Sequence, residues 1–569
     1  MSFEAYYKTE LSLVQEMARA FAELHPATAG LLKEKSGDPD VERLIEAFAF
    51  QAARIRARID QVAPSIVHGL AELMLPHHLR SLPAATIVEF APNLATLRTR
   101  QRIPAGRSLQ ARPVEGTACK FRTCFDVDLM PVEVVDVALD DRVSARPKLR
   151  LRLRCTEAGK PTLAELERLR FFIHHGEPSL PAVLMLWFMR HCKAVTVRAP
   201  GDDSELGRLD PRKLQMAGAD PAAAVFPWPT TAARGYRLVL EYFAIPEKFQ
   251  FLDVVGIDAC KLAVTEFVLC FEFERPPPLP VAIGKGSFRL HCTPAVNLFD
   301  VVAQPVSHSP LVQEHLLRAD GVPAKHMEVY EVRSVTGGGR ERRKFAPFYR
   351  FTHVASGAPS HALRRTQGID EGLDTYLSII ESNDLPATEE TLSIELTCTN
   401  RFLPRELNVG DIQDSPPGAL FKSYTNITPV SPPVRVPLGA EAQWRLLSHL
   451  ALNQRGLTSA EMLRALLGLY NLFGKSHAQI GRRNERQIEA IRKVDQEAVT
   501  WMVRGVPIRA VRTRIELDEA AVPLGHAYVF GTVLHELYGS LVHLNAASIV
   551  QLELHPSKTE LKWPVKIGT

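Results

Sequence analysis

The 569-residue chain has little net charge and no long apolar run. Its 68 Lys and Arg residues nearly balance its 64 Asp and Glu residues, which leaves a formal charge of +4. A charge this small provides no global field that would attract nucleic acid or anionic lipid, so we expect no nucleic acid partner. No stretch of about 18 apolar residues occurs, so we also predict no direct membrane insertion.

The chain also lacks a recognisable secretion signal and any paired-cysteine motif. Its first residues, Met-Ser-Phe-Glu-Ala-Tyr-Tyr-Lys, contain no basic segment followed by an apolar one. The eight cysteines occur singly, and the closest pair, Cys119 and Cys124, has four residues between its members. This spacing argues against disulfides and zinc, and it predicts reduced thiols packed in cores. Together these features predict a cytoplasmic protein.

Glycine is slightly scarce, with 33 residues, whereas proline is abundant, with 41. This combination favours rigid turns and edge strands over flexible linkers. The length and the 46% apolar share predict several domains with sizeable cores. From the changes in pattern we predict a multidomain α+β fold, with a helical segment at 1–82, a β-rich domain at 83–280, a second β-rich domain at 281–430 and a mixed α/β domain at 431–569.

Two amphipathic helices are predicted at the start of the chain, and a third, short one at 66–75. The second helix begins at Pro39, after Asp38 as its cap. In both helices apolar residues recur at alternating spacings of four and three. These seam residues are Tyr7, Leu11, Val14, Ala18 and Phe21 in the first helix, and Val41, Ile45, Phe48, Ala52, Ile55, Ile59 and Val62 in the second. A period of about 3.5 is that of a coiled coil, so the seam predicts a partner helix; packing of the two helices on each other is the alternative.

Short strands are predicted from Pro83 onward. The segment Leu149–Arg154 alternates leucine with arginine, which is typical of a strand with one buried and one solvated face. A helix-like piece is predicted at 163–172. Near the C-terminus we expect a helix capped by Ser459, a helix around 522–541, and strands at 510–517 and 547–554.

No catalytic motif is complete. The run Gly474-Lys475-Ser476 resembles the end of a phosphate loop, but position 469 is Leu and the run follows a helix. His535 and His543 are two helical turns apart, too far to share one zinc ion. We therefore predict no enzymatic activity and no cofactor or metal site. A hydrolase or transferase whose site assembles from distant His, Asp and Ser residues stays as the alternative.

Ten blocks spread along the whole chain resemble one family. The first three are YYKTELSLVQEMARAFAELHPATAGLL, DPDVERLIEAFAFQAARIRARID and LMLPHHLRSLPAATIVEF. The others are HCTPAVNLFDVVAQPV, HMEVYEVRSV, FAPFYRF, LTCTNRFLPRELNVGDI, YTNITPVSPPV, WRLLSHLALN and WPVKIG. In this order they strongly resemble the TssF family, a baseplate subunit of the bacterial type VI secretion system. The departures, NQRGLTS after WRLLSHLALN and a single proline near the end, are local.

The resemblance implies a structural role without enzymatic activity. The family is similar in architecture to a wedge protein of contractile-phage baseplates, and two copies join one TssG through helical bundles and β-rich docking domains. The wedge carries TssE and trimers of TssK, surrounds the VgrG hub, and supports assembly of the sheath and tube proteins. The implied location is cytoplasmic, in a baseplate docked to the inner-membrane complex. Within the heptad seam, we expect Ile45, Phe48 and Ile55 to face TssG or the second copy of TssF.

Overall fold

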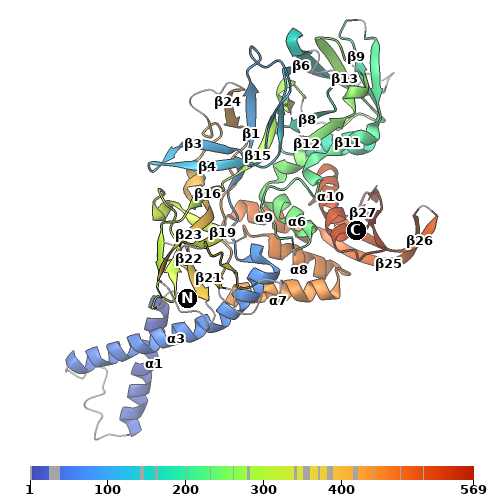
Figure 1. Ribbon diagram of the computed structural model, residues 1–569. Coiled ribbons are helices and arrows are strands. Elements are labelled where there is room, and N and C mark those ends of the chain that lie inside the picture. Colours follow the sequence, from blue (N-terminus) through green and yellow to red (C-terminus); the bar gives the residue numbers. More distant parts are fainter. Residues whose placement is uncertain are drawn as a thin grey trace. The chain divides into compact units, whose positions relative to one another are not determined.

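Figure 1 shows the computed structural model, which describes the chain except residues 1–2, 25–38, 141–145, 160–164, 202, 231, 261, 279–281, 310, 339–341, 350–358, 369–371, 381–388, 414–420, 439, 475, 504 and 569. The chain forms two compact units. The first comprises residues 1–79, 349–351 and 437–446, and the second comprises residues 80–348, 352–436 and 447–569. The predicted α+β class is confirmed, because long helices and several sheets coexist.

The first unit is dominated by two long helices, α1 (Phe3–Leu24) and α3 (Pro39–Met74), and it also contains the start of α7 (Ala440–Arg455). The prediction of a separate helix at 66–75 is wrong, because α3 continues without a break through Pro64. A proline removes one backbone hydrogen bond from a helix interior. The other backbone hydrogen bonds of this 36-residue helix are enough to keep it continuous at Pro64. The predicted start of the second helix at Pro39 is confirmed.

The second unit begins with a five-stranded sheet built from distant parts of the sequence. Its order is β24 (Phe421–Asn426), β1 (Ala85–Pro92), β15 (Cys292–Val296), β4 (Thr117–Thr123) and β3 (Ser108–Val114). The central strand β1 pairs antiparallel with β15, with Ala85 opposite Val296. A separate two-stranded ribbon pairs β2 (Gln101–Ile103) with β5 (Val127–Leu129).

Two further sheets share one core. The first has the order β10 (Glu205–Leu209), β9 (Cys192–Arg198), β13 (Glu266–Phe273), β7 (Lys148–Cys155) and β6 (Val132–Asp140). The second has the order β11 (Leu214–Met216), β12 (Phe251–Val255), β8 (Arg168–Ile173) and β14 (Phe288–Arg289). Phe188, which follows the short helix α5 (Leu180–Leu186), packs against Phe271 of the first sheet and Phe288 of the second.

Strand β7 confirms the prediction for the alternating leucines and arginines. Leu149, Leu151 and Leu153 are fully buried. On the other face, Arg152 and Arg154 both bond to Glu266 of β13, at 2.6 Å each. The arginines thus form ion pairs along a solvated sheet face. The helix predicted at 163–172 is wrong where the chain is described, because Arg168–Ile173 is strand β8, in which Arg168 and Arg170 are half-buried and the other residues are buried.

Residues 299–399 contribute two four-stranded sheets. One is built on β23 (Glu390–Thr399), which pairs with β16 (Phe299–Val302), β17 (Val306–His308) and β19 (Glu328–Gly337). The other has the order β18 (His315–Leu316), β22 (Leu373–Ile380), β21 (Ser360–Gln367) and β20 (Ala346–Pro347). Their buried apolar side chains form a separate core cluster.

The C-terminal part combines helices with one mixed sheet. After α7 come α8 (Ala460–Tyr470) and α9 (Ala478–Glu489), then β25 (Ile491–Val503), β26 (Val506–Asp518), α10 (Leu524–Ser540), β27 (Ala546–His555), β28 (Thr559–Lys562) and β29 (Lys566–Ile567). Strands β26 and β27 are parallel and joined by α10, which makes a βαβ crossover. The predicted cap is confirmed, because the Ser459 Oγ accepts a hydrogen bond from the Met462 N–H at 3.2 Å.

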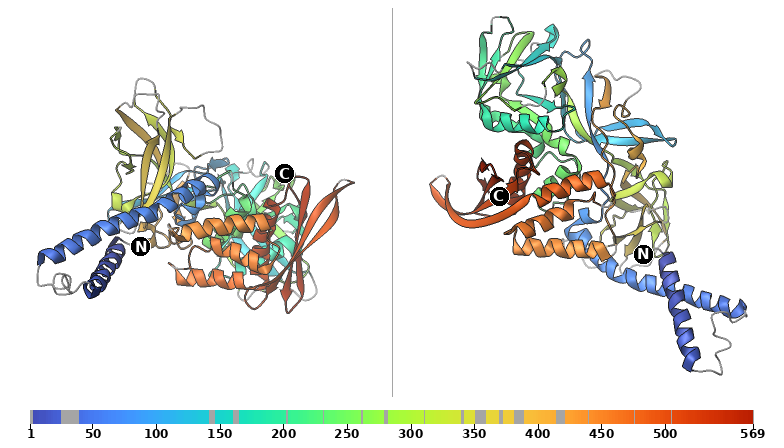
Figure 2. Two further views of the ribbon diagram at one scale, coloured as in Figure 1. Left: turned by 90° about the horizontal axis from the view of Figure 1, so that it is seen from below. Right: turned by 180° about the vertical axis from the view of Figure 1, so that it is seen from behind.

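Helix α10 is buried almost all round. Figure 2 shows the C-terminal helices and strands, in orange to red, from two further sides. Helix α10 packs against α5, β27 and α6 (Arg234–Ala244), so it links the C-terminal sheet with the core of the preceding sheets. Gly531 lets α10 lie close to the Trp563 ring, because a Cβ at this position would be only 2.3 Å from that ring. Helix α6 and strand β25 have no counterpart among the sequence predictions.

Candidate interaction surfaces

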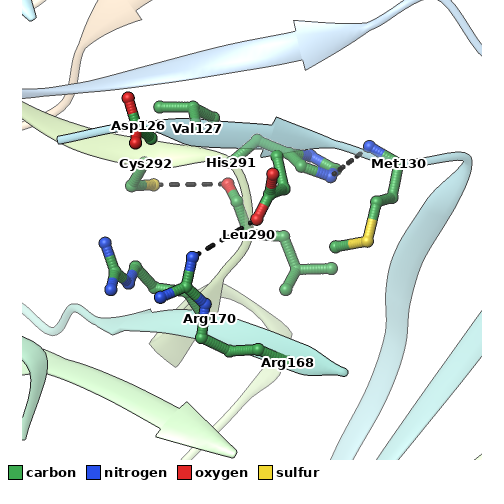
Figure 3. Close-up of a pocket in the computed structure, with 9 residues that line it drawn as sticks. Asp126, Val127, Met130, Arg168, Arg170, Leu290, His291 and Cys292 are labelled. Carbon is green, nitrogen blue, oxygen red and sulfur yellow. Dashed lines mark hydrogen bonds and ion pairs between the residues drawn. The ribbon is translucent and has the colours of Figure 1, made fainter. Parts of the chain in front are cut away.

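The described residues offer no metal centre, since no group of three or more His, Cys, Asp and Glu side chains among them could hold an ion. A cavity lined by charged groups lies between β5, β8 and β15 (Figure 3). Its volume is about 20 Å³, roughly the space of one water molecule. Such a cavity is too small for an organic substrate.

The charges around this cavity pair with one another. The Nε and Nη2 groups of Arg170 donate to the two carboxylate oxygens of Asp253, at 2.7 Å each. Arg168 lies 3.4 Å from the Asp128 carboxylate and 3.6 Å from that of Asp253. His291 accepts a hydrogen bond from the Met130 N–H at 3.3 Å, and burial lowers its pKa to about 4. These ion pairs tie the strands together, while burial favours the neutral form of the imidazole.

The cysteines lie in the structure as free thiols. Burial raises the pKa of Cys119 and Cys398 to about 12, which disfavours the nucleophilic thiolate. The prediction that these residues serve as small core side chains is confirmed for the buried ones, which are Cys119, Cys155, Cys270, Cys292 and Cys398.

The helices α1 and α3 pack on each other through small and charged residues. Ala49 and Ala53 of α3 are fully buried, and alanines at such positions let two helices approach closely. Beside them, the Arg56 guanidinium donates to the Glu10 carboxylate of α1 at 2.6 Å. The Tyr7 and Phe50 rings meet edge to face, with centroids 6.4 Å apart.

The structure divides the predicted seam between two faces. Six seam residues are half-buried: Tyr7, Leu11, Val14, Ala18, Ile45 and Ala52. Phe21, Phe48 and Ile55 are instead exposed. The side chains of Val41, Ile59 and Val62 lie outside the described set. A heptad pattern shows that apolar residues form a stripe along a helix. In this structure the stripe includes both half-buried and exposed residues.

Each helix carries a stripe of exposed apolar side chains. On α1 it consists of Leu13, Met17, Phe21 and Leu24, at spacings of four, four and three. On α3 it consists of Leu44, Phe48 and Ile55, at spacings of four and seven, which fall on one face of a helix. Sequence reasoning missed Leu13, Met17, Leu24 and Leu44. The signal was present, since these residues repeat with the helical period beside the predicted seam.

We name these seven residues the outer stripes. Phe48 and Met17 each have 64% of their surface exposed, and Ile55 has 61%. Burying a large apolar side chain contributes about 1.5–3 kcal/mol, so their combined burial by a partner would contribute several times that amount. Exposed apolar residues gathered in stripes are typical of a protein interaction surface.

Among the described helices, none combines the length and the apolarity needed to cross a membrane.

The comparisons with known proteins cover all or most of the chain. The family model for the type VI secretion system protein TssF matches residues 1–569. Type VI secretion system component TssF1 of Pseudomonas aeruginosa is 29% identical, over 99% of this chain and 98% of that protein. A solved chain from a type VI secretion system TssK–TssF–TssG baseplate subcomplex is 27% identical, with a TM-score of 0.78, and the match covers 92% of this chain and 99% of that one. A chain of another type VI secretion baseplate complex shares the fold, with a TM-score of 0.68 at 24% identity.

Proposed function

The chain belongs to the TssF family of the type VI secretion system, and from this premise we propose that it is a baseplate wedge subunit whose helices α1 and α3 dock onto TssG or onto a second copy of the chain. The observation that carries the docking proposal is the pair of outer stripes. They leave large apolar side chains exposed on helices that already pack on each other. A helical partner that covers them would complete a bundle.

The proposal extends to the other parts of the baseplate. The similar solved chain comes from a complex that contains TssK and TssG, which supports both as partners here. We infer from the family that TssE, the VgrG hub and the sheath and tube proteins assemble on the same wedge. The subunit would act in the cytoplasm, within a baseplate docked to the inner-membrane complex.

The proposed role is structural and includes no catalytic activity. The family is a component of the secretion baseplate, and a subunit of that kind acts by the surfaces that it presents. Extensive apolar burial favours obligate over transient assembly. We therefore expect the subunit and TssG to form a stable complex.

A single charge in the outer stripe tests the docking proposal. Phe48→Asp places a carboxylate on the stripe of α3, where burial against a partner would leave it unpaired. We expect the variant to fold and to lose co-purification with TssG, measured by native mass after co-expression of the two genes. The helical content should stay unchanged, because Phe48 is mostly exposed.

Ala47→Asp is the matched control. Ala47 is exposed, precedes Phe48 by one residue, and points about 100° away around the helix. This variant should bind TssG as the unaltered protein does. If Phe48→Asp also retains the unaltered stoichiometry, the stripe is not the docking surface.

A further inference from the structure

The helix α1 contacts α3 over a short part of its length within the first unit. Figure 1 shows that the two helices cross near the N-terminal end of α1, and Figure 2 shows the same crossing from behind. At this crossing Tyr7 and Glu10 of α1 meet Phe50 and Arg56 of α3. The C-terminal part of α1, which carries its outer stripe, extends beyond the crossing.

The buried side chain of α1 at this crossing is a carboxylate. Among residues 6–21 and 24, the part of α1 whose side chains are described, Glu10 alone is buried, with 7% of its surface exposed. The Arg56 guanidinium donates to it at 2.6 Å, and 53% of the Arg56 side chain is exposed. A buried ion pair contributes little net stability, because the desolvation of the charge offsets the attraction. Such pairs are better known for selecting one arrangement of two helices.

The apolar surface of α3 at the crossing does not by itself select one position for α1. Its buried residues are Ala49 and Ala53, which are one helical turn apart. If α1 slid by one turn along α3, one alanine would take the place of the other, and the close approach of the two backbones would be preserved. The same slide of about 5.4 Å would separate Glu10 from Arg56 and leave a carboxylate buried without a partner.

The position of Glu10 is coupled to that of the outer stripe on α1. Met17 and Leu24 follow Glu10 at intervals of seven residues, so the three side chains lie on one face of the helix. A rotation or slide that parted Glu10 from Arg56 would therefore move the stripe with it. We propose that the Glu10–Arg56 ion pair is a positioning contact, which holds α1 on α3 in the arrangement that presents both outer stripes to the partner. This inference rests on the proposed function and names the residues that set its geometry.

The position of α1 can be measured in the isolated full chain, without a partner. A photo-reactive phenylalanine analogue at Tyr7 should cross-link to the α3 segment around Phe50, because the centroids of the Tyr7 and Phe50 rings are 6.4 Å apart. Glu10→Gln removes the charge with little change in size, and Arg56→Ala removes its partner. Each variant should lower the yield of this cross-link about tenfold, which corresponds to a population of about a tenth for the arrangement with the ion pair.

Two further variants separate the ion pair from other effects. Arg54→Ala is the matched control, because Arg54 is exposed and points about 160° away from Arg56 around the helix. It should leave the yield unchanged. The double variant Glu10→Arg with Arg56→Glu restores an ion pair with its signs exchanged, so it should recover the cross-link. The melting temperature should change little in all of these variants, because the described core clusters of the second unit contain no residue of α1 or α3.

Binding to TssG is the second measurement. In Glu10→Gln and Arg56→Ala, the Kd for purified TssG, measured by native mass, should rise about tenfold, because fewer molecules hold α1 in the competent arrangement. The charge exchange should restore the affinity. Phe48→Asp, measured in parallel, distinguishes the two proposals. If Phe48→Asp loses TssG while the ion-pair variants bind normally, the positioning role is wrong and the docking surface stands.

The cross-link alone can also overturn the positioning role. An unchanged yield in both Glu10→Gln and Arg56→Ala would show that other contacts hold α1 in place. A double variant whose yield stays as low as that of the single variants would show that the attraction between the two charges is not the cause. If Phe48→Asp and the ion-pair variants all bind TssG normally, both the docking surface and the positioning role are wrong.

Discussion

At the scale of single residues, a buried charge pair of the second unit is held by specific partners. Glu241 and Lys248 are both fully buried and bond directly to each other. The Glu241 carboxylate also accepts the backbone N–H groups of Val225 and Phe226, at 2.7 and 3.1 Å. These bonds anchor the segment before α6 onto that helix. Removing either charge would leave the other buried and unpaired, which is strongly destabilising.

Buried histidines predict a loss of stability in mild acid. Burial lowers the pKa of His291, His449 and His535 from 6.5 to about 4. As the pH falls from 6.5 to 4, these histidines bind protons in the unfolded chain but stay neutral in the folded chain. Each histidine therefore reduces the free energy of unfolding by about 3 kcal/mol across this window, and the stabilisation is fully present above it.

The dependence can be measured by urea unfolding between pH 7.5 and pH 4.5. His291→Asn should reduce the slope of the unfolding free energy against pH, because asparagine does not titrate and tolerates the positive φ of 59° at this position. His543→Asn is the control, since His543 is exposed. An unchanged slope in His291→Asn would refute the assignment.

At the scale of elements, close packing rather than helix propensity decides the position of α10. Its sequence is apolar all round, as expected for a helix buried from several sides. Gly525 and Gly531 bring it against the α5 backbone and the Trp563 ring respectively. The helices of the first unit differ, because their uncovered stripes leave part of their apolar surface for a partner.

Two glycine substitutions distinguish packing from propensity. Gly531→Ala should destabilise the protein by about 1–3 kcal/mol, because the new methyl group overlaps the Trp563 ring. Gly468→Ala, at an exposed position of α8, should stabilise it by up to about 1 kcal/mol, because nothing lies within 4 Å of the new methyl group. Thermal unfolding of both variants checks the prediction. If both variants shift the melting temperature in the same direction by a similar amount, helix propensity alone would account for the stability at these two sites.

At the scale of the whole molecule, the second unit contains its own cores. The buried apolar clusters among its described residues draw their members from Leu82 onward. The unit therefore has the apolar burial that it needs without the helices α1 and α3.

Deletion of residues 1–79 tests this independence. We expect the remaining chain to fold and to melt close to the temperature of the full protein, because its cores are intact. Co-purification with TssG should be lost together with the outer stripes. A truncated protein that unfolds at a much lower temperature would show that the two units stabilise each other.

Much of the fold could be predicted where side-chain periodicity reflects burial directly. The alternation of β7 gave a correct strand, and Ser459 gave a correct cap. Helix α6 was missed because a short apolar run does not distinguish a buried helix from a strand. Strand β25 was missed because both of its faces mix apolar and charged residues, so that no alternation marks it.

The sequence by itself determined the family, through ten blocks in order, and the presence of apolar stripes on the first helices. Only the tertiary structure decided which side of each stripe is covered. Periodicity states that residues share a face, but the neighbour that covers the face depends on contacts between distant segments, such as Ala49 and Ala53 against α1. For the same reason the ion pair of Glu10 with Arg56, which are 46 residues apart in the sequence, became visible only in the folded chain.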